Sequence, residues 1–112
     1  MQVIVITDDA YYEDHFSYDE SIYFGHFVKN VKKFLALRKI NIELTKNNYK
    51  NIFHCEELEI LIKNLSTLKL LEEIEIKIHN KNIKLSKESS KLFKKMKILY
   101  EKDVISLFWK YK

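Results

Sequence analysis

Apolar residues follow two different periods along the chain, and each period predicts its own kind of element. Residues 3–6 are continuous and β-branched, which is typical of a short strand buried on both faces. Apolar and polar residues alternate over residues 40–44 and 74–78, and this period of two predicts strands with one buried face. Residues 83–85 predict a short edge strand, which returns from residues 74–78 through an asparagine-rich turn at residues 79–82.

Three other stretches carry apolar residues three or four positions apart, which predicts amphipathic helices. The first helix is expected over residues 17–38, because Ser17 and Glu20 fit a capping box and cations end the segment, as the helix dipole favours. The second helix is expected over residues 56–68. The third begins at Ser86 and continues to the C-terminus.

These elements follow one another in the order β-α-β-α-β-β-α, which predicts an α/β (or α+β) fold. The 112 residues are expected to form a single small domain, residues 1–112, with one mixed sheet of about four strands packed with three helices. The expected core consists of Ile4, Ile6, Phe27, Val31, Phe34, Ile42, Leu61, Leu65, Ile76 and Met96.

Composition excludes several kinds of chemistry. Gly25 is the only glycine and there is no proline, so glycine-rich phosphate loops are excluded and turns must use Asn, Asp, Ser and Lys. The lone Cys55 has no second cysteine for a disulfide or a C-x-x-C site, which favours a buried thiol, and no cofactor is expected. Because the chain lacks a long apolar run and a signal-peptide pattern, we expect a cytoplasmic protein without a membrane partner.

Charge is divided unevenly between the two ends of the chain. The first 28 residues hold six carboxylates and no lysine or arginine, so their formal charge is −6. Residues 29–112 hold all twenty cations and ten carboxylates, which gives +10. The modest net charge of +4 therefore hides a strong dipolar split.

The acidic end is also rich in aromatic residues, because residues 7–27 hold four tyrosines and three phenylalanines. Tyrosine gives a large contact area at low entropic cost, and dense carboxylates imitate a phosphate backbone and steer a basic partner. By analogy, barstar-like nuclease inhibitors and phage-encoded DNA mimics use the same physics. The alternative is an ordinary loop whose tyrosines lie partly in the core.

The acidic, tyrosine-rich segment, about residues 8–23, therefore predicts a non-enzymatic binding protein, an inhibitor, that engages a basic, nucleic-acid-processing enzyme. An immunity protein, an antitoxin and an anti-defence inhibitor all fit this prediction. The residues expected to contact the partner are Asp8, Asp9, Tyr11, Tyr12, Glu13, Asp14, Tyr18, Asp19 and Tyr23.

A metal-dependent nuclease centred on Asp8 is the first alternative. Asp8 follows the apolar first strand, at the edge where open α/β sheets usually bind ligands, and carboxylates supply the hard oxygen ligands that Mg²⁺ needs. In having an apolar first strand followed by an aspartate, the chain resembles small ferredoxin-like nucleases over about eight residues. It departs from them after Asp8, where acids and tyrosines replace the short turn into the first helix, so no catalytic residue is assigned.

A nucleic-acid-binding module is the second alternative. Lysines cluster in the last third of the chain, where they would attract phosphates without sequence specificity. Nineteen of the twenty cations are lysine, which argues against an arginine-built reader of bases. A solvated outer face of the last helix explains the same lysines more simply. The residues expected to contact nucleic acid under this alternative are Lys81, Lys84, Lys91, Lys94 and Lys95.

Overall fold

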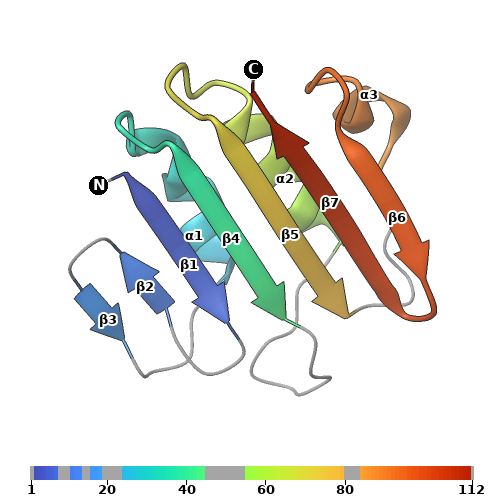
Figure 1. The fold of residues 1–112 in the computed structure, drawn as a ribbon, viewed down its shortest axis with the longest axis horizontal. Helices are drawn as coiled ribbons and strands as arrows, with labels where there is room; N and C mark the ends of the chain where they lie inside the picture. The colour runs from blue at the N-terminus through green and yellow to red at the C-terminus, as the bar shows by residue number, and fades with distance from the viewer. Residues whose placement is uncertain are drawn as a thin grey trace.

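The computed structural model describes residues 2–7, 11–13, 16–18, 24–44, 55–79 and 84–111 (Figure 1). For residues 11–13, 16–18, 24–26 and 55 it describes the backbone alone. The elements in chain order are β1 (Val3–Thr7), β2 (Tyr11–Glu13), β3 (Phe16–Tyr18), α1 (Phe24–Asn30), the 3₁₀ helix η1 (Val31–Lys33), β4 (Lys39–Leu44), α2 (Cys55–Leu65), β5 (Glu73–His79), α3 (Lys87–Ser90), β6 (Lys97–Glu101) and β7 (Val104–Lys110).

The strands form one mixed sheet in the order β3-β2-β1-β4-β5-β7-β6. Strands β1, β4 and β5 run parallel, whereas β7 pairs antiparallel with β5 and with β6. The three-residue strands β2 and β3 extend the sheet antiparallel beyond β1. The predicted α/β class is confirmed, but the described sheet has five strands of five to seven residues where about four were expected.

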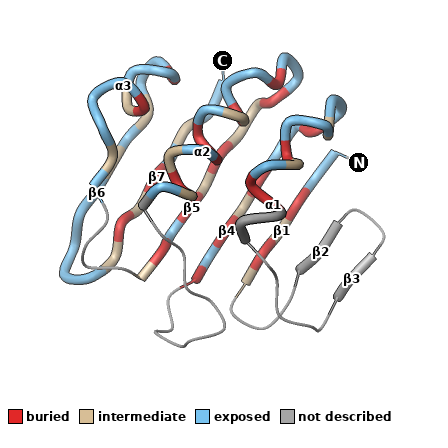
Figure 2. Tube along the Cα trace, turned by 180° about the vertical axis from the view of Figure 1, so that it is seen from behind, coloured by how far each residue is buried: buried red, intermediate tan, exposed pale blue. Residues whose placement is uncertain are grey.

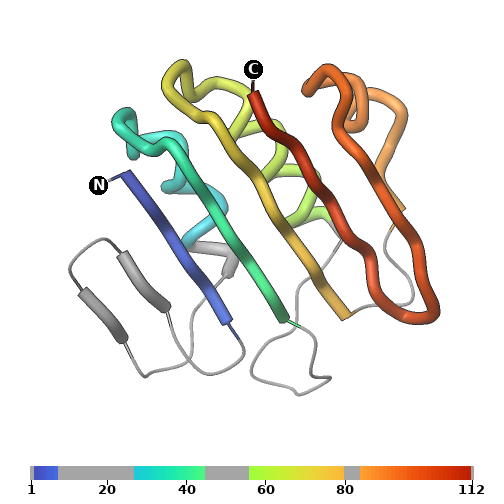
Figure 3. Tube along the Cα trace, in the orientation of Figure 1, coloured from blue at the N-terminus to red at the C-terminus, as the bar shows by residue number. Residues whose placement is uncertain are grey.

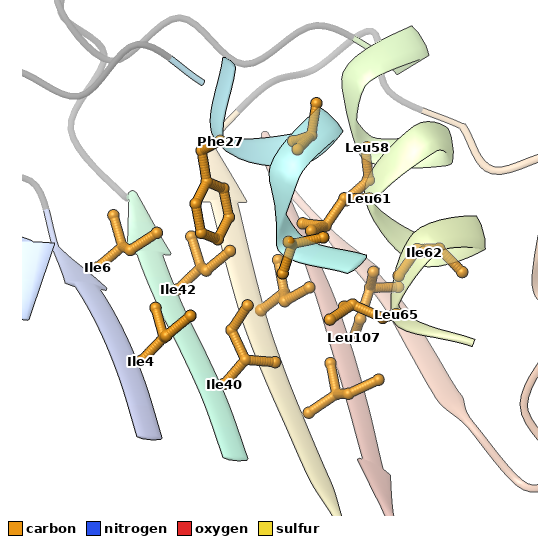
Figure 4. Packing of buried hydrophobic residues seen from close by; sticks show 14 of the residues in the cluster. Ile4, Ile6, Phe27, Ile40, Ile42, Leu58, Leu61, Ile62, Leu65 and Leu107 are labelled. Carbon is orange, nitrogen blue, oxygen red and sulfur yellow. The ribbon is translucent and has the colours of Figure 1, made fainter. Parts of the chain in front are cut away.

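Helices α1 and α2 lie on the same face of the sheet, as the opposite views in Figures 1 and 2 show. Isoleucines and leucines on that face line up across the strands, because the register places Ile6 beside Ile42, Ile42 beside Ile76 and Ile76 beside Leu107. Phe27 of α1 lies over Ile6 and Ile42, and Leu61 and its neighbours on α2 lie over the part of the row toward Leu107, as Figure 4 shows. No described helix covers the opposite face.

The predicted core is largely confirmed. Eight of the ten expected positions are buried, and the other two, Phe34 and Met96, are partly buried and pack against the core. The prediction of strands from alternating apolar and polar residues is confirmed for β4 and β5, since Ile40, Ile42 and Ile74 are buried in the core and their polar neighbours are not.

The first predicted helix is wrong in its extent. Ser17 lies in strand β3 and therefore does not cap a helix, and the helical segment runs only from Phe24 to Lys33. After Lys33 two tight backbone turns, from Phe34 N–H to the Val31 carbonyl at 3.1 Å and from Leu37 N–H to the Phe34 carbonyl at 2.9 Å, redirect the chain into β4. Leu37 is thereby fully buried, while Leu35, which the helical pattern placed on the buried face, is 74% exposed.

The predicted C-terminal helix is also wrong. Only the single turn α3 is helical, where Ser86 does act as the N-cap by accepting a hydrogen bond from Ser89 N–H at 3.2 Å. The rest of the segment forms the hairpin β6–β7, and β7 takes the place beside β5 that residues 83–85 were expected to fill. Lys84 and Leu85 belong to no strand, and Ile83 lies outside the described residues.

The stretch that joins α3 to β6 is held against strand β7 by a hydrogen bond and an aromatic contact. Trp109 Nε1 donates to the Lys94 carbonyl at 3.1 Å, and the Trp109 and Phe93 ring centroids lie 4.8 Å apart. Two lysines, Lys95 at φ 63° and Lys102 at φ 52°, take left-handed backbone conformations at the turns, whereas Gly25 lies within α1. Lysine therefore makes turns in this chain that glycine usually makes.

Leu61→Ala should lower the free energy of unfolding by about 2–4 kcal/mol, because a fully buried side chain is replaced by a cavity. Leu35→Ala is the matched control, since Leu35 is 74% exposed and its loss should change stability by less than about 0.5 kcal/mol. Urea unfolding followed by circular dichroism measures both variants. Equal losses would contradict the described core.

Lys102→Gly should raise the free energy of unfolding by up to about 1 kcal/mol, because glycine relieves the left-handed conformation in the two-residue β6–β7 turn. If residue 102 lay inside a C-terminal helix, the same substitution would lower the free energy of unfolding, since glycine inside a helix costs about 1 kcal/mol. The same urea titration distinguishes the two outcomes.

Candidate partner-binding site

The acidic, tyrosine-rich segment contributes two short strands to the edge of the sheet. Tyr11–Glu13 form β2, which pairs with β1, and Phe16–Tyr18 form β3, which pairs with β2 and is the last strand on that side. Aromatic residues favour strands, which explains why this stretch is extended and not a loop or a helical turn. Two triplets with two aromatic residues each, Tyr-Tyr-Glu and Phe-Ser-Tyr, are separated by two residues; this is a hairpin signal that the capping-box interpretation missed.

Four of the nine predicted partner-binding residues lie on this hairpin. Tyr11, Tyr12 and Glu13 form β2, and Tyr18 closes β3, where the register sets it beside Tyr11. The described backbone thus brings these four residues together. The remaining five predicted residues, Asp8, Asp9, Asp14, Asp19 and Tyr23, lie outside the described residues.

The lysine-rich third of the chain lies at the opposite edge of the sheet. Figure 3 shows the first strand, in blue, separated from the C-terminal hairpin, in orange and red, by β4 and β5. Eight exposed lysines surround this basic edge: Lys84, Lys87, Lys91, Lys94, Lys95, Lys97, Lys102 and Lys110. They occupy a helical turn, loops and a hairpin in place of the predicted outer face of a helix, and Lys81 lies outside the described residues.

Backbone hydrogen bonds tie together the ends of the strands on one side of the sheet. The Arg38 carbonyl accepts from Glu72 N–H at 2.7 Å, Arg38 N–H donates to the Gln2 carbonyl at 2.8 Å, and the Glu72 carbonyl accepts from Tyr111 N–H at 2.7 Å. An exposed ion pair of 3.1 Å joins the side chains of Arg38 and Glu72. These bonds join the amino ends of the parallel strands, whereas Asp8 follows the carboxyl end of β1 at Thr7.

No cluster of three or more His, Cys, Asp or Glu side chains that could hold a metal ion is found among the described residues. Asp8, on which the nuclease alternative is centred, is not one of those residues, so that alternative stays a prediction. Cys55 begins α2, and the structure describes its backbone alone, so the predicted burial of its thiol also stays a prediction.

The sheet face opposite the helices carries a mixture of charged and apolar side chains. Lys39 Nζ lies 3.9 Å from Glu73 Oε2, and the register sets Lys110 on the other side of Glu73. A depression of about 160 Å³ lies over β1, β4 and β5 and is lined by both kinds of side chain, including Val3 and Glu75. Drug-sized ligands need about 300 Å³ or more, so this depression does not favour a small-molecule site.

Comparisons with protein-family models, with curated proteins and with solved structures found no match to this chain. None of the helices in the described part is long and apolar enough to span a membrane.

Proposed function

We propose that the chain is a non-enzymatic binding protein whose acidic, tyrosine-rich hairpin engages a basic partner. One observation supports the proposal: the described strands of the acidic segment and the lysine-rich third of the chain lie at opposite edges of one sheet. The acidic segment supplies the strands next to β1, and the exposed lysines gather around β6 and α3. With the carboxylates of the segment on its side of the sheet, the molecule would be an electrostatic dipole, and such a dipole orients an approaching charged protein.

The hairpin combines two kinds of contact that protein interfaces use. Carboxylates raise the rate of encounter with a basic surface and exclude acidic competitors, because they act over distances of about a Debye length. Tyrosine rings add a large contact area, and buried tyrosines are frequent hot spots of binding energy. Three tyrosines, Tyr11, Tyr12 and Tyr18, belong to the two short strands, so the sheet fixes the spacing of their backbones.

A nucleic-acid-processing enzyme is the partner class that suits this surface best. Such enzymes carry clustered cations that bind phosphates, and an array of carboxylates competes for the same cations. An immunity protein, an antitoxin or an anti-defence inhibitor acts in this way by occupying the nucleic-acid groove of its target. The chain itself would then need no catalytic group, metal or cofactor.

Direct binding of nucleic acid is the second candidate, and the eight exposed lysines of the basic edge favour it. A flexible lysine binds phosphate as a point charge, so this mode would be weak in sequence preference and strongly weakened by salt. The two candidates use opposite edges of the sheet, and variants at one edge leave the other intact.

Site-specific photo-crosslinking identifies the edge in use. A benzophenone amino acid at position 12 should capture a basic protein from nuclease-treated extract of the host, whereas the same group at position 111 should not. Tyr111 is the matched control because it is 67% exposed and lies in the basic half of the chain. In extract that has not been treated with nuclease, capture of nucleic acid alone by a crosslinker at position 94 would favour the second candidate.

Neutralising the acidic segment should slow association with the captured partner. Asp14→Asn should reduce the association rate about two- to fivefold at low salt and much less at high salt, because rim charges act through screened, long-range attraction. Glu56→Gln is the control, since Glu56 is an exposed acid at the start of α2, outside the segment. Surface plasmon resonance at two ionic strengths measures both rates.

Removing a tyrosine should speed dissociation instead. Tyr12→Ala is expected to raise the dissociation rate by about 5- to 150-fold, the equivalent of 1–3 kcal/mol for a desolvated anchor, with Tyr111→Ala as the control. The same sensor experiment measures the change. The proposal fails if charge reversal at Lys91, Lys94 and Lys95 abolishes binding while the acidic segment tolerates both substitutions.

A further inference from the structure

Strand β6 is an exposed edge with unusual side chains for that position. It closes the sheet on the basic side, and no described strand lies beyond it. Leu99 is 57% exposed and Tyr100 is 55% exposed, so two large apolar groups in the middle of the strand face solvent. Exposed apolar edge strands are ready templates for pairing with another chain.

Charges usually protect such an edge, and β6 has one at each end. Lys97 begins the strand and Glu101 ends it, with Ile98, Leu99 and Tyr100 between them. A lone lysine in the middle of an edge would oppose pairing. In β6, however, a lysine and a glutamate are placed symmetrically about Leu99. When a second copy of β6 pairs with it antiparallel, each lysine meets a glutamate, so these charges favour the pairing.

The backbone groups of β6 are arranged for the same pairing. Glu101 and Val104 flank a two-residue turn, Lys102 and Asp103, and Glu101 is registered with Val104. The flanking pair of such a turn is hydrogen-bonded, and hydrogen-bonded pairs alternate along an antiparallel ladder. Lys97, Leu99 and Glu101 therefore direct their N–H and C=O groups toward β7, whereas Ile98 and Tyr100 direct theirs to the open edge.

We propose that two copies of this chain associate through β6, antiparallel, with Leu99 opposite Leu99 of the partner subunit. In this register Ile98 faces Tyr100 of the partner subunit as a hydrogen-bonded pair, and Tyr100 faces Ile98 of the partner subunit. Lys97 then lies opposite Glu101 of the partner subunit on the open face of the sheet, and the two-fold axis repeats the pair. The exposed apolar groups and the outward backbone groups are all paired in one arrangement.

The side chains also lie on compatible faces. The register of β6 with β7 sets Ile98 beside Leu107 and Tyr100 beside Ile105, both core residues, so Ile98 and Tyr100 lie on the helix side. Tyr100 Oη accepts a hydrogen bond from Leu85 N–H at 3.4 Å, which holds the ring on that side. Cross-strand pairs share a face, so an aromatic ring covers an isoleucine across each half of the junction.

Neighbouring registers do not give this match. Moving the partner strand by two residues in either direction places Leu99 opposite a charged residue of the partner subunit, and the remaining charged residue of β6 then lies opposite a residue beyond the end of the partner strand. Moving it by one residue pairs the helix side of one strand with the open side of the other. The pattern Lys-Ile-Leu-Tyr-Glu therefore specifies one register of self-pairing, and the dimer is independent of the proposed function of the acidic hairpin.

Charge reversal tests the dimer by analytical ultracentrifugation over a concentration series up to about 1 mM. Wild type should dimerise, and Lys97→Glu should weaken the dimer by roughly tenfold or more, because two attractive pairs become repulsive. Glu101→Lys should do the same, and the double variant K97E/E101K should restore the dimer. Lys69→Glu, an exposed reversal elsewhere, is the control.

A cysteine crosslink tests the register. In a Cys55→Ala background, Leu99→Cys should form an intermolecular disulfide under a mild oxidant, which takes up the two electrons released by the two thiols. Opposed non-hydrogen-bonded Cα atoms lie about 4.5 Å apart, within disulfide range. Phe108→Cys, 41% exposed on the same face one strand inward, should not crosslink. A wild-type monomer at the highest concentration, or equal crosslinking of both variants, overturns the proposal.

Discussion

The row of apolar side chains across β1, β4, β5 and β7 is the contact on which the rest of the structure depends. Ile6, Ile42, Ile76 and Leu107 are registered in a line and are each at most 1% exposed. Because each of these strands alternates between a buried and an open side, a single shift of register would move its apolar residues out of the core. The row therefore fixes the pairing of strands that are far apart in the sequence, and α1 and α2 cover it with one apolar face each.

The same physics explains what could be predicted from the sequence and what could not. Strands β4 and β5 alternate strictly, so their period admits one interpretation. Val104, Leu107 and Phe108 suit a helical stripe, yet Ile105, Leu107 and Trp109 suit a strand, and both patterns occupy the same residues. Whether these residues form a helix or a strand depends on the position beside β5, which a strand can fill. That pairing is a tertiary contact, so the local periodicity of the sequence does not reveal it. Asp8, Asp9 and Asp14 were predictable as candidates only from charge, and the described strands do not include them.

Topology places the segments from the two ends of the chain at opposite edges of the sheet. The first strand lies in the interior of the sheet, and the acidic hairpin that follows it adds strands on one side. All later strands add on the other side, so the lysine-rich C-terminal hairpin reaches the opposite edge. If the acidic segment lay beside β7 instead, its carboxylates would be close to the lysines of the same chain and would partly neutralise their positive charge. The observed order keeps the strands β2 and β3 of the acidic segment apart from the lysine-rich C-terminal hairpin.

The two edges therefore differ in the partners that they admit. Residues 1–28 carry six carboxylates and no cation, so under the proposed function this edge would repel a second copy of itself and attract a basic molecule. Strand β6 itself carries one lysine and one glutamate placed symmetrically about Leu99, so that in one register each lysine of the strand meets a glutamate of a second copy. Joining two copies at β6 would place the acidic hairpins at the two far ends of one continuous sheet. Self-association and the capture of a basic partner would then proceed on separate surfaces, without competing for the same backbone groups.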